Sequence, residues 1–236
     1  MNFSLVMGQK SQLFWDLPAI ESFHLNQTIY EIDEKKFKAI VGKLVELLGV
    51  KDLLKIQVRR LSLGERMKME LIASLLHEPK VLFLDEPTIG LDVLSQKNMR
   101  EFLKSYNSEQ KTTILLTSHY MHDIAELCER IVLIHLGRII YDGSLKALTD
   151  KISTKKIIRL ELEKPVDIEE MKKFGHIKLF SPHSATIEIE RENIKSTAKL
   201  LLDHLPILDL TIEDVPIEEI VALLYRQTAN DAEYES

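Results

Sequence analysis

The sequence predicts an α/β domain with a parallel sheet, followed by a smaller α+β domain. Three observations predict this arrangement. Before Leu148, short apolar strands alternate with helical patterns, as in parallel β-α units. After Leu148, the strand patterns alternate apolar and polar residues, as half-buried strands do. Their order is strand, helix, strand, strand, helix, strand, which is that of a ferredoxin-like domain. We therefore expect domains at residues 1–148 and 149–236.

Composition narrows the classes of protein that need to be considered. The chain has 236 residues, 45% hydrophobic and 29% charged, which is typical of a globular protein with a sizeable core. Its formal net charge of −6 gives no electrostatic reason to expect nucleic-acid binding. Cys128 is the single cysteine, which excludes an intrachain disulfide and fits a reducing, cytoplasmic setting. No apolar run approaches the ~20 residues that cross a bilayer, so we expect no direct membrane insertion.

The first elements are a strand and a group of helices. "FSLVM" reads as a short strand, and residues 20–58 have a helical pattern with Gly49 as a stop. A further helix covers "LSLGERMKMELIASLL". Ser62 and Glu65 at its start have the S-x-x-E spacing of a capping box.

The next elements alternate strand and helix. The strand "KVLFLDE" is followed by a helix at "SQKNMREFLKSYN", a buried strand at "TTILLTSH" and a short helix at "MHDIAELCER". Two strands around a turn are predicted at "IVLIHLGRIIYDG". Parallel strands that read as apolar throughout are normally covered on both faces, so we expect helices on both sides of this sheet.

In the second domain, the predicted strands are "KIIRLELE", "HIKLFS", "ATIEIE" and "ILDLTIE". Helical patterns lie between them at 168–174 and 194–205, and a last one follows at 217–225.

Two adjacent carboxylates and a histidine follow neighbouring apolar strands. Asp85 and Glu86 end one predicted strand and His119 ends the next, and open parallel sheets bind ligands beyond the carboxyl ends of their strands. Buried charges must be paired or bound to metal. Asp85 could therefore hold Mg²⁺, Glu86 could orient or deprotonate a water, and His119 could hydrogen-bond a phosphoryl oxygen. The alternative is a salt-bridged acidic turn beside an unrelated histidine, and the dipeptide alone favours that alternative.

Three longer segments favour a functional site over a structural turn, because they occur together and in order. They are "MGQKSQLFWDLP", "LSLGERMKMELIASLLHEPKVLFLDEPTIGLD" and "TTILLTSHYMHDIAELCERIVLIHLGRIIYDG". Over about residues 4 to 148 the chain resembles the ATP-binding subunits of ABC transporters. The resemblance implies part of a P-loop NTPase sheet with a helical subdomain, and ATP and Mg²⁺ as cofactors. It also implies a membrane permease and a second ATPase subunit, paired across the nucleotide, as partners.

The resemblance assigns roles to individual residues. Gln9 would be the Q-loop glutamine, which touches Mg²⁺ and senses the membrane partner. Asp85 would be the magnesium carboxylate, Glu86 the catalytic base, Asp92 the D-loop aspartate and His119 the switch histidine.

Ser62, Leu63, Gly64 and Glu65 would form the signature loop, which caps the γ-phosphate bound on the opposite subunit. A helix that opens after Ser62 points its first N–H groups at a phosphate, although Ser62 could also serve only as a cap. The loop departs from the common LSGGQ form because Leu63 replaces Gly and Glu65 replaces Gln. We interpret this as a variant of one branch of the family, with the hydrolysis rate left open.

Four segments are similar in sequence to the branch of ATPases that pairs with ABC-2 type permeases: "GQKSQLFWDLP", "LSLGERMK", "DEPTIGLD" and "TSHYMHDI". That branch includes many exporters, and a C-terminal α+β extension is common in it. The resemblance therefore implies export, with the chain peripheral on the cytoplasmic face of the inner membrane through its permease. The apolar segment around Trp15 suits docking of a permease helix, although Trp15 could equally be a core residue.

The chain departs from the family in one motif. A P-loop needs G-x-x-x-x-G-K-[ST], and no such run occurs; the single Gly-Lys pair, Gly42 and Lys43, is followed by Leu44 in a helical pattern. In the family the P-loop precedes the Q-loop glutamine by tens of residues. We therefore expect a chain that begins in mid-domain and is inactive alone, with the edge of the "TTILLT" strand unpaired.

Three functions remain open on these observations. The first is an ATPase subunit of a transporter, or the C-terminal part of one. The second is a non-hydrolysing interaction module, or a gene remnant, that pairs with a full-length ATPase. The third is an ABC ATPase acting on nucleic acid or ribosomes, which the acidic charge and the single ATPase segment disfavour.

Overall fold

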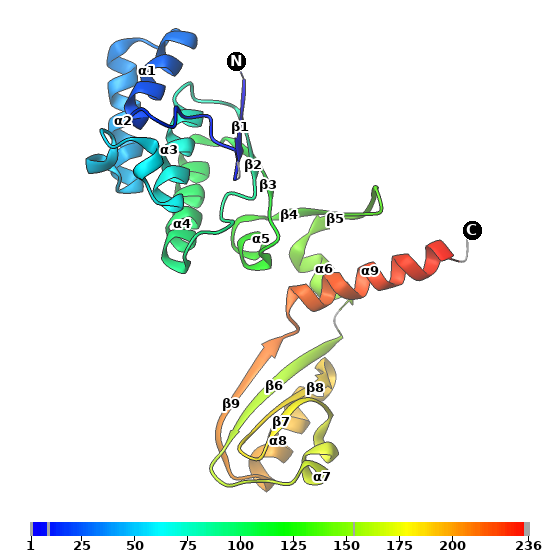
Figure 1. Cartoon of the computed structure of the whole chain (residues 1–236). Coiled ribbons are helices and arrows are strands. Elements are labelled where there is room, and N and C mark those ends of the chain that lie inside the picture. Colours follow the sequence, from blue (N-terminus) through cyan, green and yellow to red (C-terminus); the bar gives the residue numbers. More distant parts are fainter. Residues whose placement is uncertain (1, 9, 153, 234–236) are drawn as a thin grey trace. The chain divides into compact units, whose positions relative to one another are not determined.

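The computed structural model describes residues 2–8, 10–152 and 154–233 (Figure 1). Its contacts divide the chain into two compact units, Met1–Cys128 and Glu129–Ser236. This division falls before the predicted domain limit at residue 148, because the hairpin that follows Cys128 belongs to the second unit. Domain limits at 1–148 and 149–236 stay a prediction.

A parallel sheet forms the frame of the first unit. Strands β1 (Phe3–Met7), β2 (Val81–Asp85) and β3 (Thr113–Thr117) lie in the order β1-β2-β3, and both pairs are parallel. The register aligns Met7 with Asp85 and Asp85 with Thr117. All three strands therefore end at the same level, and the residues that follow them share one edge of the sheet.

The described residues of the first unit form the α-helices α1 (Ala19–Ile29), α2 (Glu34–Leu48), α3 (Leu63–Leu75), α4 (Val93–Gln110) and α5 (Met121–Leu127). Short 3₁₀ turns lie at Lys51–Leu53 and Val58–Arg60. Helix α2 ends at Gly49, whose φ of 64° is the left-handed conformation that glycine adopts at helix ends. The predicted stop at Gly49 and the predicted capping box of Ser62 and Glu65 are both confirmed.

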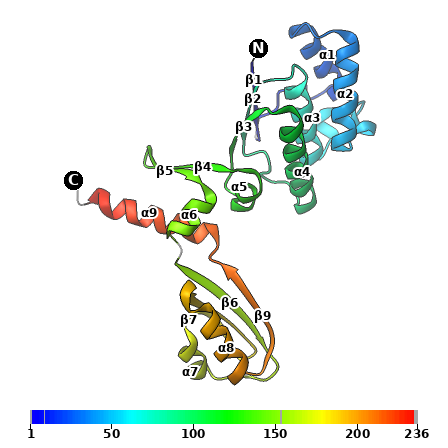
Figure 2. The same cartoon turned by 180° about the vertical axis from the view of Figure 1, so that it is seen from behind.

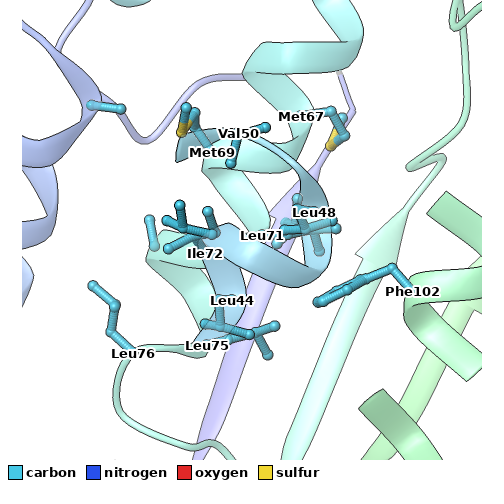
Figure 3. Close-up of a cluster of buried hydrophobic side chains, with 14 of the residues drawn as sticks. Leu44, Leu48, Val50, Met67, Met69, Leu71, Ile72, Leu75, Leu76 and Phe102 are labelled. Atoms are coloured by element: carbon cyan, nitrogen blue, oxygen red, sulfur yellow. The ribbon is translucent and has the colours of Figure 1, made fainter. Parts of the chain in front are cut away.

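The core of this unit lies between its helices and one face of the sheet. Figure 3 shows Leu44 and Leu48 of α2 beside Leu71 and Leu75 of α3, with Phe102 of α4 at the same cluster. Each of these side chains is at most 5% exposed. Burial of an apolar side chain of this size contributes ~1.5–3 kcal/mol, so this cluster fixes the three helices against one another.

The opposite face of the parallel sheet is open. Figures 1 and 2 show α1 to α4 on one side of β1 to β3. On the other side Phe3, Leu5, Phe83 and Leu115 are 50%, 43%, 37% and 49% exposed. The prediction that helices cover both faces is therefore wrong for the residues that the structure describes. Among those residues β3 pairs only with β2, so the predicted free edge of "TTILLT" is confirmed.

The second unit begins with a hairpin and contains a four-stranded sheet. Strands β4 (Arg130–His135) and β5 (Arg138–Ser144) form the hairpin, and helix α6 (Leu145–Ile152) follows. Strands β6 (Lys155–Leu162), β7 (His176–Ser181), β8 (Ser184–Glu190) and β9 (Ile207–Asp214) pair antiparallel in the order β7-β8-β6-β9. The strands and helices follow one another along the chain in the order that the sequence predicted for a ferredoxin-like domain.

Helices cover one face of the four-stranded sheet. Figure 2 shows α7 (Ile168–Met171) and α8 (Ile194–His204) on the same side of it. Short 3₁₀ turns lie at Lys172–Phe174 and Arg191–Asn193, and α9 (Ile217–Glu233) follows β9. Ile158, Ile187 and Leu201, all 0% exposed, form the centre of this core. Within the described residues, no helix combines the length and the apolar character needed to cross a bilayer.

A buried polar cluster connects the loops that follow β2 and β3. The Asp123 carboxylate, 1% exposed, lies 2.8 Å from Arg100 Nη1 and accepts a hydrogen bond from the buried Thr88 hydroxyl. Ser118 Oγ donates to the same carboxylate at 3.3 Å. Arg100 Nε lies 3.4 Å from Glu126 Oε2, without the geometry of a hydrogen bond. Thr88 belongs to the loop after β2 and Ser118 to the loop after β3, so Asp123 holds the two loops together.

We expect Asp123→Ala to lower the free energy of unfolding of the first unit by about 3–5 kcal/mol, because it leaves the Arg100 charge buried without its main partner. Urea unfolding followed by circular dichroism measures this. Glu109→Ala is the matched control, because it removes an exposed ion pair with Lys43 (2.6 Å) in the same unit and should cost less than about 1 kcal/mol. Equal losses in both variants would show that the buried cluster does not hold the loops.

The open face of the sheet generates a second prediction. Phe83→Lys should reduce both self-association and binding of an apolar dye while changing the melting temperature little, because Phe83 already contacts solvent. Leu84→Lys, one residue further along the same strand, should cost several kcal/mol because Leu84 is 1% exposed. Light scattering, dye fluorescence and thermal unfolding compare the two. The open face would be refuted if Phe83→Lys destabilised the chain as much as Leu84→Lys.

Candidate functional site

The predicted carboxylates lie where the three parallel strands end. Asp85 closes β2, and its Oδ1 accepts a hydrogen bond from the Thr117 hydroxyl of β3 at 2.7 Å. The Glu86 N–H donates to Thr117 Oγ1 at 3.1 Å. Asp85 is exposed, so the expectation of a buried charge at the end of this strand is wrong for Asp85. Its carboxylate is instead fixed at one oxygen and reaches solvent, which is suitable for holding a ligand.

Glu86 contacts His119 across the strand ends. The backbone of Glu86 has φ 51°, the left-handed conformation that is uncommon for a residue other than glycine and is frequent at functional sites. Its Oε2 accepts a hydrogen bond from the backbone N–H of His119 at 3.1 Å, and its Oε1 lies 3.4 Å from the ring nitrogen Nε2 of His119. The glutamate side chain is 17% exposed and the histidine side chain 86%. The structure thus brings together the predicted base and the predicted switch histidine, with the histidine facing solvent.

Gly8 lies against the backbone of Asp85 and Glu86, and its role was not predicted from the sequence. Its N–H donates to the Asp85 carbonyl at 2.8 Å, and a Cβ at Gly8 would come within 2.4 Å of the Glu86 carbonyl oxygen. A side chain at this position would therefore push the loop after β2 away. A glycine at the end of a strand, directly before Gln9, was the available signal. Gln9 itself lies outside the described residues.

The predicted signature residues open helix α3. The Ser62 hydroxyl accepts the Glu65 N–H at 3.3 Å, and Glu65 Oε2 accepts the Ser62 N–H at 2.8 Å. Both side chains therefore stabilise the start of the helix. The N–H groups of Leu63 and Gly64 belong to the first turn, where no carbonyl of the same helix can accept them. They remain available to an anion, in addition to the capping role.

Asp92 is held beside the signature residues. Its Oδ1 accepts the Ser95 N–H at 2.9 Å and its Oδ2 accepts the Ser95 hydroxyl at 2.6 Å, and these hydrogen bonds hold the pKa of Asp92 below its usual range. A Cβ at Gly64 would come within 2.9 Å of Ser95 Oγ, and one at Gly90 within 2.9 Å of Leu63 Cδ2. The loop before α4 and the start of α3 therefore pack closely through two glycines.

Glu70 joins helix α3 to the segment at Ser11 and Gln12, and this role was not predicted from the sequence either. Its carboxylate, 4% exposed as a residue, accepts the Ser11 hydroxyl at 2.5 Å and the Gln12 N–H at 3.0 Å. Burial raises the pKa of Glu70, and the hydrogen bonds from Ser11 and Gln12 oppose this. An isolated glutamate in a helical pattern gave no signal, because its partners are nearly sixty positions away in sequence.

The residues present fit a magnesium ion held mainly by its nucleotide. Among the described residues no three His, Cys, Asp or Glu side chains gather as a metal site. Mg²⁺ in phosphate-transferring proteins typically takes one or two carboxylates and completes its shell with phosphate oxygens and water. One exposed carboxylate, Asp85, fixed by Thr117, is consistent with that arrangement.

An exposed apolar patch lies in the segment between Gln9 and helix α1. We call Phe14, Trp15 and Leu17 the loop patch; they are 46%, 49% and 45% exposed. The Arg66 guanidinium of α3 lies 5.2 Å from the centroid of the Trp15 ring. The alternative of a core tryptophan is therefore wrong, and Trp15 faces solvent beside helix α3.

Family models match two segments of the chain. Residues 154–213 match the model of the EvrA-like ABC transporter, C-terminal domain, and residues 11–121 match an AAA domain model. The chain is 33% identical over 144 residues to the ABC transporter ATP-binding protein NatA of Bacillus subtilis. That alignment covers 61% of this chain and 58% of NatA.

Two further relatives and a solved structure agree. The Linearmycin resistance ATP-binding protein LnrL of Bacillus subtilis is 25% identical over 235 residues, covering 96% of this chain and 75% of LnrL. The "Probable multidrug ABC transporter ATP-binding protein YbhF" of Escherichia coli is 34% identical over 140 residues, covering 58% of this chain and 24% of YbhF. A solved ATP binding subunit of an ABC transporter shares the fold, with a TM-score of 0.56, 23% identity, and coverage of 64% of this chain and 62% of that one.

Both units thus match ABC transporter proteins. The chain belongs to the ATP-binding proteins of ABC transporters.

Proposed function

We propose that this chain energises export through an ABC-2 type permease, by hydrolysing ATP when a phosphate-binding loop is supplied to its strand-end residues. The observation that carries the proposal is the contact of Glu86 with His119 beside Asp85, at the aligned ends of β2 and β3. A carboxylate for the metal, a base for the attacking water and a hydrogen-bond donor to the phosphate are groups that phosphoryl transfer to water uses.

Each residue has a separate task in this proposal. Mg²⁺, when bound with ATP, would neutralise phosphate charge, and Asp85 would hold it with the oxygen that Thr117 leaves free. Glu86 would orient the attacking water and accept its proton. The largely exposed ring of His119 would donate a hydrogen bond to the phosphate, while the backbone N–H of His119 keeps the Glu86 carboxylate in position.

The start of α3 supports a second phosphate contact in the same proposal. The first-turn N–H groups of Leu63 and Gly64 and the positive end of the helix dipole suit the γ-phosphate of a nucleotide held by a second ATPase subunit. Ser62 and Glu65 cap each other, so Leu63 in place of glycine leaves the helix start intact. Asp92, held through Ser95 beside Gly64, would lie at the same dimer interface.

The loop patch supports a permease as the partner. Its three large apolar side chains are each nearly half exposed in a short segment, which marks a protein-binding surface more often than an isolated exposed residue does. The names of LnrL and YbhF refer to linearmycin resistance and multidrug transport in those proteins, and this supports export as the direction. The chain would then sit on the cytoplasmic face of the inner membrane through this permease.

A second candidate function rests on the missing motif. Without G-x-x-x-x-G-K-[ST], the 236 residues lack the N–H cradle and the lysine that supply most triphosphate affinity. The chain could therefore act as a non-hydrolysing module that offers its helix start and loop patch to a complete ATPase. The spacing of Glu86 and His119 favours the hydrolytic function, because an interaction module has no need of that contact.

We expect the 236-residue chain by itself to bind Mg-ATP with a dissociation constant weaker than about 1 mM and to show no turnover, because its sequence has no phosphate cradle. Isothermal titration calorimetry and phosphate release measure the two quantities. Micromolar binding would refute the expectation, since it would require a cradle that is absent from the sequence.

A fusion that places a G-x-x-x-x-G-K-[ST] segment from an ABC ATPase ahead of Phe3 tests the proposed roles. In this fusion Glu86→Gln should retain ATP binding and lose turnover by about 10²–10⁴-fold, because the amide cannot accept the proton. Asp85→Asn should instead weaken magnesium-dependent binding, because a neutral amide is a poorer ligand for a hard dication.

Glu101→Gln, an exposed glutamate of α4, is the control and should match the parent fusion. If Glu86→Gln turned over ATP as fast as the parent, the acidic pair would be a structural turn. A parent fusion that binds ATP without turnover would favour the interaction module.

A further inference from the structure

The second unit contains a cavity that no part of the proposed nucleotide site touches. It has a volume of about 400 Å³, is partly open to solvent, and lies between one end of the four-stranded sheet and helix α9. This volume falls within the range of small-molecule sites in proteins, ~300–1,000 Å³. The lining combines charged and apolar side chains, which is the usual composition of such sites.

The cavity is on the face of the sheet that α7 and α8 leave uncovered. On β8, Ile187 and Ile189 face the core, so Glu188 between them points to the opposite face. Val215 and Ile220, 6% and 0% exposed, lie at the start of α9 and line the cavity together with Lys155, Lys178 and Glu188 of the sheet. The cavity is therefore lined by the uncovered face of the sheet and by the start of α9.

The charges of the cavity leave one cation in excess. Glu188 Oε2 lies 2.9 Å from Lys155 Nζ and its Oε1 lies 3.6 Å from Lys178 Nζ, while Lys178 also contacts Glu219. Burial raises the pKa of Glu188, but its contacts with the two lysines outweigh this and lower the pKa overall. Two carboxylates thus face three cations, and Arg226 has no carboxylate within ion-pair distance in the described part of the chain.

Beside Arg226 the lining is apolar. Leu223 lies one helical turn before Arg226 on α9 and is 45% exposed, which is large for a leucine next to a cavity. Ala222, Ile220 and Val215 continue this apolar wall toward the sheet. A ligand that matches both properties carries one negative charge and a short apolar chain.

We propose that the second unit binds a small amphipathic carboxylate in this cavity, with the carboxylate at Arg226 and the alkyl chain along Leu223. A guanidinium is suited to this task because it donates two parallel hydrogen bonds to a carboxylate. The alkyl chain removes the exposed part of Leu223 from water. This binding does not depend on ATP hydrolysis or on a permease.

Titration of octanoate into the full chain tests the proposal, with calorimetry for affinity and methyl NMR of Leu223 for location. We expect one site with a dissociation constant below about 1 mM. Both 1-octanol, which lacks the charge, and acetate, which lacks the chain, should bind at least about 10-fold more weakly. Arg226→Gln should weaken octanoate binding at least about 10-fold, and Leu223→Asn should weaken it as well.

Lys199→Gln is the matched control, because Lys199 is an exposed cation of α8 on the opposite face of the sheet, and it should leave octanoate binding unchanged. Circular dichroism checks that every variant keeps its fold. The proposal is overturned if octanoate does not bind, if 1-octanol binds equally well, or if Arg226→Gln binds octanoate like the parent. It is also overturned if the Leu223 methyl signals do not shift at saturation.

Discussion

The parallel pairing of β2 between β1 and β3 is the constraint on which the first unit depends. Because Met7, Asp85 and Thr117 stand in register, the loops that follow all three strands begin at one edge. Short-range contacts then hold these loops together. Gly8 packs against the Glu86 carbonyl, and Asp123 holds both the loop after β2 and the loop after β3. The contact of Glu86 with His119 therefore depends on the register of the strands and on the buried carboxylate of Asp123.

The same sheet has two faces with different chemistry. One face is buried under helices, where Leu82 and Leu84 are at most 1% exposed, whereas Phe83 between them faces solvent together with Leu115 of the edge strand. Parallel sheets are normally covered on both sides, so an open apolar face of this kind favours association with further protein. The open face and the free edge are observed in the structure of the parallel sheet, whereas the absence of a P-loop motif is observed in the sequence.

Local patterns predicted most of the elements, because helix periodicity, strand alternation and caps are properties of neighbouring residues. The stop at Gly49 and the capping box of Ser62 and Glu65 are examples. The strand-end rule also brought Glu86 and His119 together correctly. The exposure of the sheet could not be predicted in this way, because coverage depends on segments distant in sequence. The partners of Asp123 and Glu70 were missed for the same reason, since a buried ion pair or hydrogen bond leaves no periodic signal.

Glu70 gives the two predicted functional regions of the first unit a physical connection. It is part of α3, the helix that Ser62 opens, and its carboxylate binds Ser11 and Gln12 in the segment that leads to the loop patch. A second contact runs in parallel, because Arg66 of the same helix lies over the Trp15 ring. A partner that displaces the loop patch must therefore either move α3 with it or break hydrogen bonds to a buried carboxylate, and the second outcome is costly. Under the proposed function, docking at the loop patch and the placement of the signature residues are coupled through this helix.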